Sequence, residues 1–112
     1  MDEVYEFLKK VGAYYLATAD GDQPRVRVFG TIDKFEDKLY IQTGKVKDVS
    51  KQMKANPKIE ICGFMDGTWV RVTAKARLDE RLEPQKHMLD AYPGLQDRYQ
   101  AGDGNNEVFY LE

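Results

Sequence analysis

Two arginines stand at a spacing that suits the binding of an anion. Arg25 and Arg27 alternate along residues 24–29, and the period of two of a strand places both side chains on one face. Arginine offers a planar fork of N–H donors that matches the oxygens of a phosphate. The same pattern is also typical of a half-exposed strand edge with cross-strand ion pairs, so the spacing leaves both interpretations open.

A second cationic segment follows at the end of the next predicted strand. Thr43 precedes Lys45 and Lys47, and these lysines begin a predicted helix over residues 45–55. Free backbone N–H groups at a helix start attract anions, and lysines there oppose the helix dipole unless an anion lies beside them. The alternative is a basic, solvated helix face, because the lysines continue further along the same helix.

Trp69 and Arg71 fall on the polar side of the longest predicted strand, residues 68–78, which alternates with a period of two. A large aromatic side chain on that side exposes apolar area unless something covers it. A flat ligand, a second subunit or the N-terminal helix could provide the cover.

The remaining reactive side chains point to no catalytic group. His87 is the single histidine and is expected on the surface, and Cys62 is expected to be a small buried filler in a strand. One histidine and one cysteine do not make a metal-ligand pattern. The catalytic residues therefore stay unassigned, and no metal is expected.

Composition bounds the class of protein. A chain of 112 residues with a formal net charge of −2 predicts one soluble domain and does not favour wholesale binding of nucleic acid. The acidic start is not a signal peptide, and no stretch approaches the ~20 apolar residues of a membrane span. With its single cysteine, the chain is expected in the cytoplasm, away from membranes.

Hydrophobic periodicity supplies the elements that must position these residues. Helical spacing is found over residues 2–11, 45–55 and 84–92, with a short helix at 95–99. Strand patterns at hairpin spacing cover residues 14–19, 25–32, 38–43, 58–64, 68–78 and 108–111. Residues 33–37 are expected to be a turn. Short strands at this spacing favour a closed or nearly closed antiparallel barrel.

The order of these segments resembles the pyridoxamine 5′-phosphate oxidase-like family with the FMN-binding split barrel. The segments that carry the resemblance are residues 15–18, 24–28, 39–43, 56–57 and 69–72. The match extends to about Leu78. It implies a mainly β fold with flanking helices, in the form of a six-stranded antiparallel split β-barrel of Greek-key type. Residues 1–112 would form this single domain, and the resemblance implies that it is short at its C-terminus.

The resemblance also implies a function and a site. It implies an FMN-dependent oxidoreductase that acts on a small-molecule substrate, in the form of a homodimer with the cofactor at the interface. Arg27 would approach the phosphate or the ribityl chain of FMN, and Lys45 and Lys47 would clamp the phosphate. Trp69 with Arg71 would approach the flavin, contributed by the other subunit. The implied cofactor contacts are Arg27, Val28, Phe29, Gly30, Gln42, Thr43, Lys45, Lys47, Trp69 and Arg71.

The chain departs from the oxidases in two respects. It has no C-terminal segment with arginine and histidine to grip pyridoxal phosphate, so oxidation of vitamin B6 is not expected. Asp48 and Val49 stand where the oxidases carry an arginine–lysine pair. The alternative function is a non-catalytic small barrel that binds nucleic acid through the face of Trp69, or another cofactor such as haem or a deazaflavin.

Overall fold

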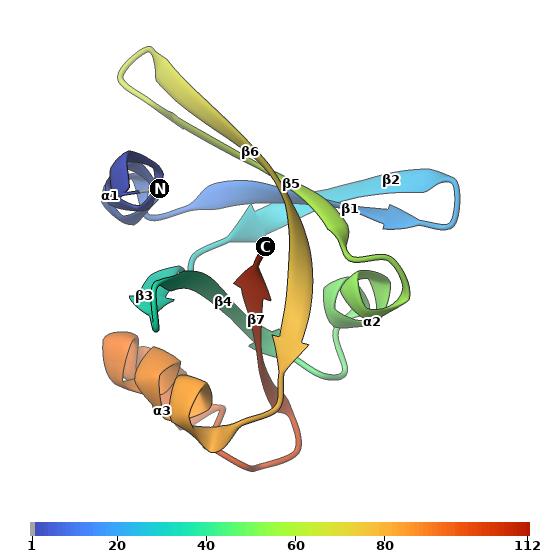
Figure 1. Ribbon diagram of the computed structural model, residues 1–112, viewed down its shortest axis with the longest axis vertical. Helices are drawn as coiled ribbons and strands as arrows, with labels where there is room; N and C mark the ends of the chain where they lie inside the picture. Colours follow the sequence, from blue (N-terminus) through green and yellow to red (C-terminus); the bar gives the residue numbers. More distant parts are fainter. Residues whose placement is uncertain (1) are drawn as a thin grey trace.

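One antiparallel sheet of seven strands forms the centre of the structure, with three α-helices packed around it (Figure 1). The computed structural model describes residues 2–112; Met1, where the expected domain begins, lies outside this range. The elements in chain order are α1 (Asp2–Val11), β1 (Tyr14–Asp20), β2 (Gln23–Phe29), β3 (Asp33–Phe35), β4 (Lys38–Gly44), α2 (Asp48–Ala55), β5 (Lys58–Met65), β6 (Thr68–Asp79), α3 (Leu82–Ala91), the 3₁₀ helix η1 (Pro93–Asp97) and β7 (Asn106–Leu111).

The sheet confirms the mainly β prediction and corrects its details. The strand order is β2-β1-β5-β6-β7-β4-β3, and β2 and β3 remain unpaired edges in the part of the chain that is described. The sheet is therefore not closed, and it has seven strands instead of the expected six. The additional strand is β3, in the segment expected to be a turn. Glu36 and Asp37 adopt positive φ angles of 52° and 62°, which makes a tight hairpin turn and frees the preceding residues to pair with β4.

Strand β6 joins the two halves of the sheet. Its residues up to Lys75 pair with β5, and its last residues, from Ala76 to Asp79, pair with β7. The sheet curves around the core at this change of partner, as Figure 1 shows. The predicted alternation along β6 is confirmed, because Val70, Val72 and Ala76 pack in the core.

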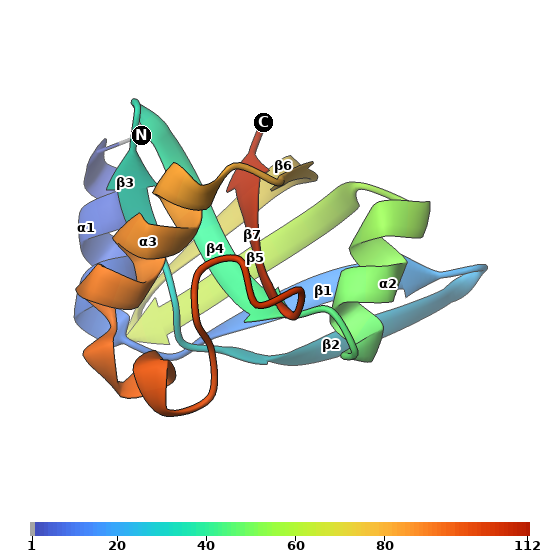
Figure 2. The same ribbon diagram turned by 90° about the horizontal axis from the view of Figure 1, so that it is seen from below.

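The helices cover the inner side and the ends of the sheet. Helix α1 ends at Val11 and is followed by Gly12, whose φ of 78° suits the residue after a helix C-terminus. It packs on β5 at Gly63, where an added Cβ would lie 3.0 Å from a methyl of Leu8. Figure 2 shows α2 beside the β1–β2 hairpin and α3 beside β3 and β4. Among residues 2–112, no helix is long and apolar enough to cross a membrane.

A clamp around Arg81 joins the β3–β4 turn to the end of β6. The guanidinium donates to Glu36 Oε1 (2.6 Å) and Asp79 Oδ2 (2.9 Å), and Tyr40 Oη donates to the same Asp79 oxygen (2.7 Å). The hydrogen bond from Arg81, with help from Tyr40 and against the effect of burial, lowers the pKa of Asp79 to about 2. Burial, followed by the contact with Asp79, raises the pKa of Tyr40 to about 12.

We expect this clamp to make the protein less stable in acid. The pKa of Asp79 falls from 3.8 to about 2 on folding. The stabilisation is therefore complete above the pKa of the unfolded state, and it is lost as the pH falls through the pKa of the folded state. The free energy of unfolding should drop by at most about 2 kcal/mol from this source. Urea unfolding at about pH 6 and about pH 2 measures the drop. Asp79→Asn should reduce it; an equal drop in both proteins would exclude Asp79 as its origin.

Candidate functional site

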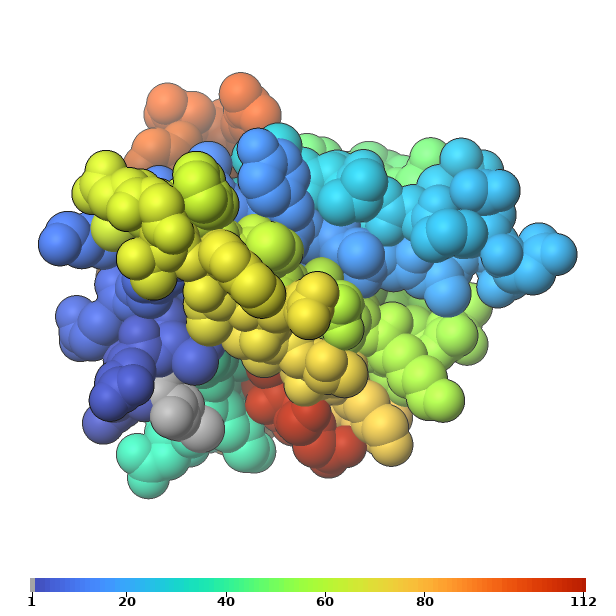
Figure 3. Space-filling view, turned by 90° about the horizontal axis from the view of Figure 1, so that it is seen from above, coloured from blue at the N-terminus to red at the C-terminus, as the bar shows by residue number. Residues whose placement is uncertain are grey.

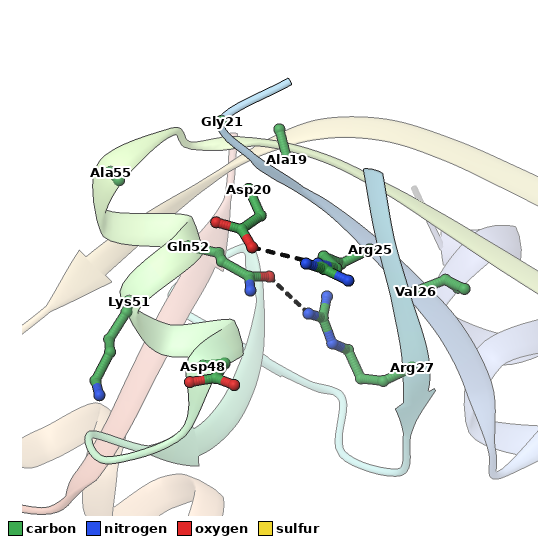
Figure 4. A pocket seen from close by; sticks show the side chains of 10 residues that line it. All are labelled: Ala19, Asp20, Gly21, Arg25, Val26, Arg27, Asp48, Lys51, Gln52 and Ala55. Carbon is green, nitrogen blue, oxygen red and sulfur yellow. Dashed lines mark hydrogen bonds and ion pairs between the residues drawn. The ribbon is translucent and has the colours of Figure 1, made fainter. Parts of the chain in front are cut away.

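Both predicted arginines line one hollow between α2 and the β1–β2 hairpin (Figure 4). Its volume of about 590 Å³ lies within the range of small-molecule sites. Val26, between the two arginines on β2, points away from it, so the prediction that Arg25 and Arg27 share a face is confirmed. The lining residues are Ala19, Asp20, Gly21, Arg25, Val26, Arg27, Asp48, Lys51, Gln52 and Ala55.

Arg27 is anchored on the floor of this hollow by three neighbours. Its Nη1 donates to Thr18 Oγ1 (2.7 Å) and to the backbone oxygen of Leu16 (3.3 Å), and its Nη2 donates to Gln52 Oε1 (2.7 Å). The side chain is half-buried, and burial lowers the pKa of its guanidinium while the charge of Asp48 opposes that effect. An arginine remains charged at neutral pH despite such a shift.

Charges of both signs surround Arg27. Arg25 is paired with Asp20 across 3.2 Å, and Asp48 begins α2 at the edge of the hollow. Lys51 also lines the hollow, and no ion-pair partner for it is found among residues 2–112. The lining therefore carries three cations and two carboxylates. Arg27 points into the hollow, whereas the Lys51 side chain extends from α2 away from the two arginines (Figure 4).

The predicted anion turn differs from expectation. Helix α2 begins at Asp48, three residues later than predicted, and Lys47 is its N-cap without a side-chain capping bond. The N–H of Lys45 donates to Asn105 O (2.8 Å), and that of Lys47 donates to Gly44 O (3.0 Å). These two amides are already satisfied. Both lysine side chains are exposed, and Lys47 directly precedes Asp48, which lines the hollow.

Four of the other predicted cofactor contacts lie on β4 or at the end of β2. Gln42 and Thr43 are only 6% and 4% exposed, because β4 is buried on both faces. Gln42 Nε2 donates to Asn106 Oδ1 (2.8 Å) on β7, so this side chain holds the two strands together. Phe29 is buried against Tyr14, and the following Gly30 is exposed.

The remaining predicted contacts belong to an uncovered outer face of the sheet. Figure 3 looks onto this face, where the blue β1–β2 hairpin and the yellow β5–β6 hairpin have neither α2 nor α3 in front of them. Cross-strand pairs join its side chains: Tyr15 faces Val28, and Phe64 faces Trp69. The large hydrophobic residues more than half exposed there are Tyr15, Val26, Val28, Phe64 and Trp69. We call these five residues the outer apolar face.

Trp69 and Arg71 lie together on this face but away from Arg27. The guanidinium of Arg71 lies 5.4 Å from the centre of the Trp69 ring. Strands β1 and β5 separate β2 from β6, so at least roughly 14 Å, three strand spacings, lies between Arg27 and Trp69. In one copy, Arg27 points into the hollow beside α2, whereas Trp69 is exposed on the outer face of the sheet.

The single histidine and the single cysteine are placed elsewhere. His87 Nε2 lies 2.8 Å from Asp33 Oδ2 and its ring is half-exposed, as expected for a residue near the surface. Cys62 is half-buried and faces Tyr15 on the outer side, not in the core as predicted. Within the described residues, no group of three or more His, Cys, Asp or Glu side chains is placed to hold a metal ion.

Comparison with known proteins identifies the family. Residues 1–109 match the family described as pyridoxamine 5′-phosphate oxidase. The chain belongs to this family. It is 45% identical to a NimC/NimA family protein from Clostridium acetobutylicum, with a TM-score of 0.96 over 99% of this chain and 81% of the other. No curated protein matches the chain.

More distant structures share the fold alone. A putative pyridoxamine 5′-phosphate oxidase from Listeria innocua is 19% identical, with a TM-score of 0.78 over 99% of this chain and 90% of the other. The heme storage protein HutZ from Vibrio cholerae is 18% identical, with a TM-score of 0.73 over 99% of this chain and 87% of the other. The fold is thus shared by proteins described with different functions.

The sequence interpretation missed the residues that hold Arg27. Thr18 and Gln52 are two polar residues without motif context, 34 positions apart, and their side chains meet only after α2 packs on β1. The one available signal was that Gln52 interrupts the lysines of its helix. This signal does not identify a partner on β2.

Proposed function

We propose that the chain is an FMN-binding oxidoreductase of one domain that works as a homodimer on a small-molecule substrate. The observation that carries the proposal is the anchored Arg27 in the hollow beside α2. Membership of the pyridoxamine 5′-phosphate oxidase family supports it.

The chemistry of the hollow fits a phosphate group. A guanidinium has five N–H donors, and the three described bonds of Arg27 leave two of them for a ligand. Lys51 lines the same hollow, and Lys45 and Lys47 are exposed in the turn that leads to Asp48 of its lining. We propose that these four cationic side chains, Arg27 and the three lysines, hold the phosphate. Gln42 and Thr43 in β4 would support the turn that carries Lys45 and Lys47.

The flavin ring is proposed to lie toward the outer apolar face. Val28, Phe29 and Gly30 leave the hollow along β2 and would present their backbone to the edge of the ring. Trp69 and Arg71 would reach the same ring from a second copy, because within one copy Trp69 is exposed on the outer face, three strand spacings from the strand of Arg27. Burial of the outer apolar face between two copies would also remove its exposed area from water.

FMN supplies hydride transfer when it is bound. The residues of this chain would bind its phosphate, orient its ring and exclude water from one ring face. No described side chain is assigned as an acid or base. A cytoplasmic location remains an expectation from the single cysteine.

Absorption spectroscopy of the freshly purified protein tests this function. A yellow protein with flavin absorbance is expected, and mass spectrometry of the compound released on denaturation should identify FMN. A colourless protein that takes up no FMN on titration would overturn the proposal.

Haem is the alternative that the comparison with HutZ raises, since that protein is described as a heme storage protein. The single histidine, His87, is already bonded to Asp33 at 2.8 Å, which disfavours iron ligation. A Soret band in place of flavin absorbance would support haem. A nucleic-acid surface around Trp69 is disfavoured because Arg71 and Arg77 pair with Glu60 (3.9 Å) and Glu112 (3.1 Å).

A further inference from the structure

Gln52 is the one residue of α2 whose side chain bonds to Arg27. Its Oε1 accepts from Arg27 Nη2 (2.7 Å) and from Thr18 Oγ1 (2.5 Å). Figure 4 shows this oxygen directed from α2 toward the guanidinium across the hollow. Only the oxygen of the amide can accept from two donors, so the network itself fixes the orientation of the amide.

The bonds that Arg27 makes leave a specific edge of its guanidinium open. Both hydrogens of Nη1 are used, by Thr18 Oγ1 and Leu16 O, and one hydrogen of Nη2 is used by Gln52. The remaining donors are Nε–H and the second Nη2–H, which point in the same direction along one edge of the planar group. That edge is the fork that binds two oxygens of a phosphate.

Gln52 is an uncharged hydrogen-bond partner of Arg27, and this affects the charge of the site. The amide oxygen of Gln52 orients Arg27 without cancelling its positive charge, as a carboxylate would. Asp48 lines the same hollow, and its charge opposes the fall in the pKa of Arg27 that burial causes, so it is an available competing partner. Without Gln52, the free fork of Arg27 can turn toward this carboxylate.

We propose that Gln52 is a positioning residue that makes the site specific for the phosphate-bearing flavin. It holds Arg27 with its open fork toward the ligand phosphate, and thereby sets the preference for FMN over riboflavin, which lacks the phosphate. This inference rests on the proposed function, because it assigns the part of that site that selects the ligand.

The test is the ratio of FMN to riboflavin affinity in two matched variants. Gln52→Met keeps the length of the side chain and removes the acceptor. Gln23→Met makes the same change at an exposed glutamine of β2, whose described side-chain bond goes only to the neighbouring Pro24 O. Fluorescence titration should show that Gln52→Met weakens FMN binding by about tenfold, or about 1.4 kcal/mol, and leaves riboflavin unchanged. Gln23→Met should change neither.

A second variant keeps the inference testable if Gln52→Met does not fold. Gln52→Glu keeps both accepted hydrogen bonds but cancels the charge of Arg27, so it should lose the preference for FMN while binding riboflavin normally. Thermal unfolding of each variant checks that it is folded.

The outcomes separate the inference from the proposed function. A wild-type protein that binds neither flavin contradicts the proposed function itself. A wild-type protein that prefers FMN, with the same preference in Gln52→Met and Gln52→Glu, overturns the role of Gln52 alone. Equal losses of both flavins in these variants also overturn it, because they show a general structural effect.

Discussion

Replacing Arg27 with methionine is expected to weaken FMN binding by at least about a hundredfold. The substitution removes the fork that would make two charge-assisted hydrogen bonds to the phosphate, and two such bonds contribute roughly 3 kcal/mol or more. Methionine keeps most of the aliphatic stem, so the packing between β2 and α2 should be largely retained. Isothermal titration or flavin fluorescence measures the affinity, and riboflavin should bind to the variant as it does to the wild type.

Arg25→Met is the matched control for this prediction. Arg25 lies on the same strand and lines the same hollow, but Asp20 already neutralises it at 3.2 Å. We expect its loss to weaken FMN binding by no more than about threefold, the scale of an exposed ion pair. Similar losses in the two variants would show that the net charge of the hollow, and not the geometry of Arg27, governs binding.

Introducing a charge on the outer apolar face is expected to convert the proposed dimer to a monomer. Trp69→Glu with Phe64→Glu would place two carboxylates in each copy, on neighbouring strands where their side chains face each other. Desolvation of unpaired charges costs several kcal/mol per ion, enough to dissociate an interface of ordinary affinity. Analytical ultracentrifugation should show a dimer for the wild type and a monomer for the variant at micromolar concentration.

A single substitution on the same face links assembly to cofactor binding. If FMN lies between two copies, Phe64→Glu alone should also give a monomer that loses FMN, although Arg27 and the proposed flavin contact Trp69 are both untouched. Leu82→Glu is the control, because Leu82 is an exposed hydrophobic residue at the start of α3, away from this face. A wild-type protein that is a monomer, or a monomeric variant with full FMN affinity, would contradict a cofactor site at an interface.

Local pattern was sufficient to predict most of the strands. Side chains along a strand alternate between two faces of the sheet that differ in solvent exposure, so the sequence alternates with a period of two. This alternation predicted both faces of β6 correctly. The shared face of Arg25 and Arg27 follows from the same period. Strand β3 escaped prediction because its turn uses Glu36 and Asp37 at positive φ instead of glycine.

The candidate site was only partly predictable, for a physical reason. The placement of Arg27 depends on Gln52, 25 residues later, and this contact exists only once α2 docks on the β1–β2 hairpin. The resemblance to the family implied that Gln42 and Thr43 lie at the phosphate end of the ligand. In the structure β4 is covered on both sides, so these residues satisfy one another and their neighbours inside the protein.

The position of β7 has a consequence for how the protein is made. β7 is the strand through which the β3–β4 hairpin joins the rest of the described sheet, and it pairs Gly44 with Asn106. During synthesis, β4 therefore presents an open, largely apolar edge until residues 106–111 have been produced. The nascent chain must keep that edge from joining another molecule, and β7, more than 60 residues after β4, is the strand that covers it.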